Sequence, residues 1–303
     1  MILFNYLLMC LIFGTTFLAI KVGINASSPP FFSAGLRFLV AGLVILLWMV
    51  WRKKATFALL LRKEMLLSGL GLTFGTFSML YWAEQHVSSG IAAVLSATGP
   101  LMIMLIQMSV LGEKTTVRSA LGCMIGFAGV ILLMLSDLSI SSAADHWWLM
   151  GGIAILIGEI CYASGALYSQ RVIQRLPNVS PIALNAAQMI YGGLLLLLLS
   201  FFTEQVHLEQ MLEPNAIGSL LYLIIVGSMA GHSIFYWLVA KTNPVFPSTW
   251  LYVSPIIAMA TGSILYHETV TWVSIIGMIT IIGGTVVTNL DKITQLMHVN
   301  KKA

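Results

Sequence analysis

Charged residues are scarce in this chain. They make up 9% of its 303 residues, whereas hydrophobic residues make up 58%. A soluble domain of ordinary composition has about a quarter of its residues charged. This composition therefore excludes a soluble globular protein. The net charge of +4 comes from basic residues scattered over separate segments, a distribution that does not favour nucleic-acid binding.

Cysteines and catalytic motifs are equally sparse. Cys10, Cys123 and Cys161 all fall in apolar stretches and lack the spacing of metal ligands, so we expect packing residues, no metal and no cofactor. The sequence contains neither H-E-x-x-H nor G-x-S-x-G, which argues against an intramembrane enzyme. A membrane sensor is a further alternative, and it lacks support because no soluble signalling domain is recognisable.

What the chain has instead is a series of long apolar stretches. About twenty apolar residues are needed to cross a hydrocarbon core of ~30 Å. Helices are expected, because lipid leaves exposed backbone amides without hydrogen-bond partners. We therefore predict an all-α membrane protein with ten transmembrane helices in the lipid bilayer. The predicted spans are 2–22, 31–51, 65–84, 88–111, 117–136, 147–170, 182–202, 216–238, 244–266 and 272–290.

The second half of the sequence repeats the first. Eight residues recur after a constant 155 positions, which indicates an internal repeat. We predict two five-helix repeats, over 1–140 and over 141–303, the second with a short cytoplasmic tail. The recurring pairs are Tyr81/Tyr236, Trp82/Trp237, Pro100/Pro255, Met104/Met259, Glu113/Glu268, Thr116/Thr271, Gly122/Gly277 and Gly129/Gly284.

Because each half has an odd number of spans, the second repeat must be inverted relative to the first. With a cytoplasmic N-terminus, thirteen of the fifteen Lys and Arg residues lie on the inner side. The positive-inside rule thus places both termini in the cytoplasm. Inverted repeats favour a substrate site near the midplane and alternating access. Since one chain supplies both repeats, a monomer suffices; a dimer is the alternative.

Several short motifs resemble the EamA-type transporters of the drug/metabolite transporter (DMT) superfamily. The resemblance extends over nearly the whole chain, from about residue 3 to residue 290. It implies a ten-helix fold in a bacterial inner membrane and export of amino acids, related metabolites or toxic compounds. It does not specify the substrate, and an uncoupled facilitator of the same fold is the alternative. The segments that carry it are F-G-T-T-F at 13–17, F-S-A-G-L-R-F-L at 32–39, A-A-V-L-S-A-T-G-P at 92–100, Gly112-Glu113, Ser254-Pro255 and His267-Glu268.

Glu159 is the sharpest candidate for function, because it lies near mid-depth of the sixth span. A carboxylate at that depth costs several kcal/mol unless it is paired, hydrated or protonated. It could carry a coupling proton or bind a substrate amine. The alternative is a protonated glutamic acid that links helices by a hydrogen bond.

Aromatic residues and one histidine complete the predicted substrate site. Rings in the spans can bind amphipathic or cationic small molecules by stacking and cation–π contact. The alternative for Tyr81 and Tyr236 is a place in the interfacial aromatic belts. His232 could exchange protons or be a packing residue. The full set of candidates is Tyr81, Tyr162, His232, Tyr236, Trp237 and Trp250, together with Glu159.

Three further residues are expected to shape the fold or its movement. Arg37 lies inside the second span and could bind a carboxylate, although a structural role is favoured. Pro100 and Pro255 occupy equivalent places in the two repeats and predict paired helix bends, either as hinges or as static kinks. Lys21 is expected to extend to the outer interface.

Overall fold

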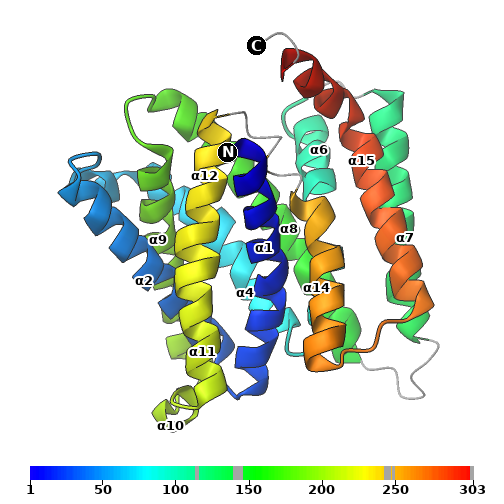
Figure 1. Cartoon of the computed structure of the whole chain (residues 1–303), viewed down its shortest axis with the longest axis horizontal. Coiled ribbons are helices and arrows are strands. Elements are labelled where there is room, and N and C mark those ends of the chain that lie inside the picture. Colours follow the sequence, from blue (N-terminus) through cyan, green and yellow to red (C-terminus); the bar gives the residue numbers. More distant parts are fainter. Residues whose placement is uncertain (113–115, 139–145, 242–246, 248–249, 301–303) are drawn as a thin grey trace.

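Helices account for all the regular secondary structure in the described part of the chain (Figure 1). The computed structural model describes residues 1–112, 116–138, 146–241, 247 and 250–300. The predicted boundary between the repeats, at 140/141, lies outside these residues.

The first five predicted spans each coincide with helical structure, and two of them are divided. The third span consists of three consecutive segments, and the fourth is broken between two helices. The elements are α1 (Ile2–Asn25), α2 (Pro30–Trp51), α3 (Lys63–Gly69), η2 (Leu70–Gly75), α4 (Thr76–Ala83), α5 (Ser89–Ser96), α6 (Gly99–Ser109) and α7 (Val117–Leu138), with a short η1 (Phe57–Leu61) after α2.

The last five spans follow the same order. The eighth span is again made of three consecutive segments, whereas the described part of the ninth, from residue 250 on, is one helix. The elements are α8 (His146–Arg175), α9 (Pro181–Thr203), α11 (Pro214–Tyr222), η3 (Leu223–Gly231), α12 (His232–Lys241), α14 (Trp250–Tyr266) and α15 (Trp272–Asn300), with a short α10 (Leu208–Met211) before α11.

Length and hydropathy confirm the all-α membrane fold. Within the described residues, seven helical segments are long and apolar enough to cross a membrane, and three shorter apolar helices accompany them at 117–132, 250–266 and 272–288. Several of these helices start at a proline, where the missing N–H costs nothing: Pro30, Pro181 and Pro214 begin α2, α9 and α11. The inverted relation of the two halves stays a prediction.

Two segments depart from α-helical geometry. η2 and η3 are π-helical, with one residue more in each hydrogen-bonded turn. Shifted by the repeat offset of 155, η2 would cover 225–230, which lies inside η3. In each segment, one backbone carbonyl lies within hydrogen-bond distance of the side chain of the residue five positions later. The Thr76 hydroxyl donates to the Gly71 carbonyl over 3.0 Å, and Nδ1 of His232 lies 3.2 Å from the Gly227 carbonyl. The two halves thus share a local irregularity as well as a sequence pattern.

The helices pack in pairs drawn from both halves. α2 packs along α9, and α7 packs along α15. These two pairs lie at opposite ends of the molecule, with α1, α4, α8 and α14 between them (Figure 1). Many of the residues in the largest buried apolar cluster belong to α4 and α5. The candidate site therefore lies among central helices that the two outer pairs flank.

Glycines set how closely the paired helices approach. A Cβ on Gly284 of α15 would lie 2.3 Å from the backbone nitrogen of Gly126 of α7. A Cβ on Gly71 would lie 2.8 Å from the Cα of Gly165 on α8. Such backbone-to-backbone contacts need small residues, as in membrane helix pairs generally.

Replacement of Gly284 by alanine should therefore destabilise the α7–α15 pair. The added methyl group has no space, and overpacking of this kind costs about 1–3 kcal/mol. The neighbouring Gly283→Ala is the matched control, because nothing lies within 4 Å of a Cβ at that position. Unfolding of the purified protein in SDS mixed micelles measures the difference. Equal stability of the two variants would contradict the close contact.

Candidate functional site

Glu159 lies against the break in the fourth span. Its side chain is only 6% exposed, and it has a side-chain hydrogen bond with Ser96, the last residue of α5. A Cβ on Gly99, the first residue of α6, would lie 2.6 Å from Oε2 of Glu159. The carboxyl group thus sits between the end of one half-helix and the start of the next. The positive end of the α6 dipole is close to it, which favours an anion there.

Two of the predicted tyrosines lie near this carboxyl group. The ring of Tyr162 lies 3.4 Å from the same Cβ position on Gly99. Tyr236, on α12, is 8% exposed and close enough to Tyr162 for the two phenol groups to interact electrostatically. Glu159, Tyr162 and Tyr236 therefore form one group, built from α8 and α12 around the start of α6.

Arg37 forms the centre of a second group. Its side chain is 1% exposed, and its guanidinium group donates to the Ser228 hydroxyl over 2.8 Å and to the Tyr81 hydroxyl over 3.2 Å. It also lies over two aromatic rings, 4.6 Å from the centre of Phe38 and 5.3 Å from that of Phe77. These contacts join α2, α4 and η3. The two hydroxyl oxygens supply part of the hydrogen-bond acceptors that the guanidinium group needs, and the two aromatic faces lie against its charge.

His232 and Trp250 belong to an aromatic group along α1. The ring of Phe13 lies 5.1 Å from that of His232 and 4.7 Å from that of Trp250. Trp237 packs against the same apolar cluster, which includes Phe13. The seven predicted substrate residues are thus divided among three neighbouring groups, and α12 contributes to two of them. Tyr81 and Tyr236 are both buried, so they lie inside the protein and outside any interfacial belt.

The two prolines that the repeat relates occupy different local structures. Pro100 lies in the first turn of α6, directly after the break at Ala97–Thr98. Pro255 lies inside α14, which continues without a break. The paired bend expected from the sequence is therefore a true interruption in the first half only. The free helix ends beside Glu159 therefore belong to the fourth span.

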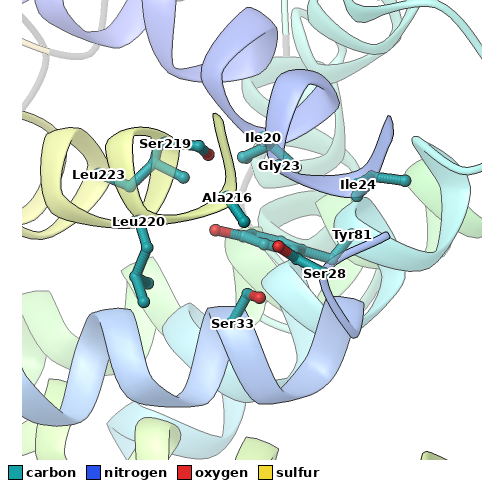
Figure 2. Close-up of a pocket in the computed structure, with 10 residues that line it drawn as sticks. All are labelled: Ile20, Gly23, Ile24, Ser28, Ser33, Tyr81, Ala216, Ser219, Leu220 and Leu223. Atoms are coloured by element: carbon teal, nitrogen blue, oxygen red, sulfur yellow. The ribbon is translucent and has the colours of Figure 1, made fainter. Parts of the chain in front are cut away.

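The internal cavities near these groups are small. One cavity is lined by residues of α1, α2, α4, α11 and η3, and Figure 2 shows Tyr81 lying across it, with the hydroxyls of Ser28 and Ser33 close by. A second lies between α3, α8, α9 and Tyr236. Each has a volume of about 10 Å³, room for about one water molecule. Ligand sites usually measure about 300–1,000 Å³, so a metabolite cannot enter either cavity without movement of the helices.

Sequence reasoning missed several residues that the structure brings to the site. Ser96 and Ser228 are small polar residues in apolar stretches, and nothing in their local sequence marks them as partners of Glu159 and Arg37. The sequence also gives no indication of the two π-helical segments. The Nζ atom of Lys21 donates to the carbonyls of Glu84 and Val87, in the turn between α4 and α5, over 2.5 and 2.9 Å.

The fold and the buried polar groups define a multi-pass helical membrane protein, and comparison with known proteins specifies its family. The chain belongs to the EamA-like transporter family, whose model matches residues 1–135 and 149–290. It is 31% identical to the uncharacterized inner membrane transporter YedA of Escherichia coli strain K12, over 93% of this chain and 88% of YedA. This result confirms the predicted family, which is a family of transporters and not of enzymes.

Two further comparisons extend this result. The chain is 27% identical to a probable amino-acid metabolite efflux pump of Salmonella typhimurium, over 93% of this chain and 92% of that protein. A solved crystal structure superposes with a TM-score of 0.66 at 17% identity, covering 95% of this chain and 96% of the other. At that identity, the likeness supports the fold alone.

Removal of the Tyr81 hydroxyl should destabilise the protein more than removal of the neutral hydrogen bond made by the half-buried Tyr222. Tyr81→Phe takes a partner from a buried guanidinium, and hydrogen bonds to charged groups contribute about 1.5–3 kcal/mol. Tyr222→Phe is the matched control, because its hydroxyl bonds only the Thr15 hydroxyl, at 2.6 Å. That neutral bond should contribute about 0.5–1.5 kcal/mol. Equal losses in the free energy of unfolding would show that Arg37 does not depend on Tyr81.

Proposed function

We propose that this protein exports small amino-acid-like or amphipathic metabolites across the inner membrane by alternating access. The observation that carries the proposal is the burial of Glu159 beside the broken fourth span. A carboxyl group in this position can bind a substrate amine or carry a coupling proton. Two relatives support the proposal, since one is an uncharacterized inner membrane transporter and the other a probable amino-acid metabolite efflux pump.

The proposed site lies between the two repeats, 1–140 and 141–303. Glu159 and Tyr162 belong to the second repeat, whereas Ser96 and Gly99 belong to the first. Inverted repeats with both termini in the cytoplasm would place this contact near the midplane, where transporters with broken helices bind their substrates. The aromatic residues around it, Tyr236 among them, would contact the apolar part of the substrate.

Movement of the helices is part of the proposal, because the cavities beside the site hold about one water molecule each. The half-helix α6 and the π-helical segments are the places where such movement needs the fewest broken backbone hydrogen bonds. π-helical turns are frequent at functional sites for this reason. Each chain contains both repeats, so one molecule would complete a transport cycle.

An uncoupled facilitator of the same fold is the second candidate function, because the fold alone does not specify energy coupling. The buried carboxyl of Glu159 favours the coupled exporter, since a facilitator has no need for a costly ionisable group at this depth. Collapse of the exported substrate gradient by a protonophore separates the two candidates.

Glu159→Gln should abolish most of the export activity. Cells expressing the protein are loaded with labelled amino acids and cationic toxins, and efflux is compared at matched membrane abundance. Removing one member of a buried charged contact costs about 2–5 kcal/mol, so export of the transported compound should fall at least about tenfold. Glu209→Gln, in the exposed α10, is the control that should export normally. Equal export by both variants would remove Glu159 from the mechanism.

A further inference from the structure

A second acidic residue is more deeply buried than Glu159. Glu84 follows α4 directly, and its side chain is 0% exposed. Among the described residues, neither oxygen of its carboxyl group has a hydrogen-bond partner. Buried polar groups are nearly always hydrogen-bonded, so a carboxyl group without a partner needs an explanation.

The nearest cation does not neutralise the Glu84 carboxyl group through a hydrogen bond. Lys21 of α1 donates instead to the main-chain carbonyls of Glu84 and Val87. These two bonds fasten α1 to the turn between α4 and α5. Lys21 thus supplies a positive charge next to Glu84 while its described hydrogen bonds go to the backbone.

Another carboxylate has already taken the hydrogen-bond donors of this region. Glu268, just after α14, accepts from the Ser89 backbone N–H and hydroxyl at 2.9 and 2.8 Å, and from the Gly90 N–H at 3.2 Å. It therefore caps the start of α5, where a helix end favours a negative charge. The charges of Lys21 and Glu268 balance, and the further cation near Glu84, Arg37, directs its described hydrogen bonds to Ser228 and Tyr81.

We propose that Glu84 is a proton-binding residue of this transporter, neutral in the closed arrangement seen here and able to release its proton when the helices separate. A desolvated carboxylate without donors costs several kcal/mol, which binding of one proton removes. The repeat gives Glu84 no acidic counterpart, because Val239 stands 155 residues later. The residue is therefore not part of the duplicated framework.

Three charged side chains approach Glu84, each from a different helix. Lys21 approaches from α1, Glu268 from the end of α14, and Arg37 from α2. Arg37 already bonds Ser228 and the Tyr81 hydroxyl, on the preceding turn of α4. His86, two residues along the chain, stacks on Trp147 with ring centres 5.3 Å apart. None of these contacts supplies a hydrogen-bond donor to the Glu84 carboxyl group in the described residues.

The position of Glu84 connects its proton to opening of the transporter. The bonds of Lys21 and Glu268 fasten the ends of α1 and α14 to the α4–α5 turn, and they cover Glu84. Separation of these ends would admit water, and a hydrated carboxyl group is ionised at neutral pH. Since the closed arrangement binds this proton more tightly than the open one, low pH should favour closure and high pH should favour opening.

Infrared spectroscopy of the purified protein in liposomes tests the assignment directly. A protonated carboxyl group gives a C=O stretching band that a carboxylate lacks. At neutral pH, Glu84→Gln should remove a part of this band that both Glu159→Gln and Glu209→Gln retain. A spectrum of Glu84→Gln identical to that of the wild type would overturn the proposal.

Thermal stability provides the second measurement. Glutamine has the shape of a protonated glutamic acid, so Glu84→Gln should fold and keep its Tm as the pH rises. The wild type should lose stability over the same rise, because the folded protein holds a proton that the unfolded chain releases. A parallel decline in both proteins, or failure of Glu84→Gln to fold, would contradict a neutral Glu84. Neither result depends on whether Glu159 supports export.

Discussion

The burial of charge inside an apolar helix bundle is the constraint on which the rest of this structure depends. Arg37 is almost completely enclosed, and the described groups around it are hydroxyls and aromatic rings. One guanidinium group can contact Ser228, Tyr81 and Phe77 only if η3 and α4 lie at matching positions along α2. The same requirement applies to Glu159, which needs the broken end of α5 beside it. Contacts between buried polar groups thus specify how the helices lie relative to one another. The apolar outer surfaces of the helices do not specify this.

Small residues allow the helices to come close enough to take up these positions. Lipid offers no hydrophobic gain for bringing two apolar helices together, so close contact must come from packing. The approach of α7 to α15 and of η2 to α8 brings backbone atoms against one another. The α7–α15 pair is therefore closely packed, whereas Glu159 lies on the central helix α8 and Arg37 extends from α2 towards α4 and η3.

Much of the fold could be predicted from the sequence, because lipid imposes a length and a polarity on each span. Every predicted span coincides with helical structure, and Glu159 and Arg37 were recognisable as charges in apolar stretches. Their partners were not recognisable, since Ser228 lies 191 residues from Arg37 and looks like any small helix residue. Glu84 was missed for a related reason. In the sequence, Ala83-Glu84-Gln85-His86 is typical of a polar turn at the membrane surface, and its burial depends on segments far from it in the chain, such as α8, whose Gly151 lies against Ala83 and His86.

The two π-helical segments also say something about the history of the chain. A π-helical turn holds one residue more than an α-helical turn, so it corresponds to an insertion that the surrounding helix has absorbed. η2 and η3 occupy the same place when the halves are aligned by their offset of 155 residues. Two independent insertions at one position are a less economical account than a single inherited one. If the predicted repeats arose by duplication of a five-helix unit, one insertion in that unit would account for both segments.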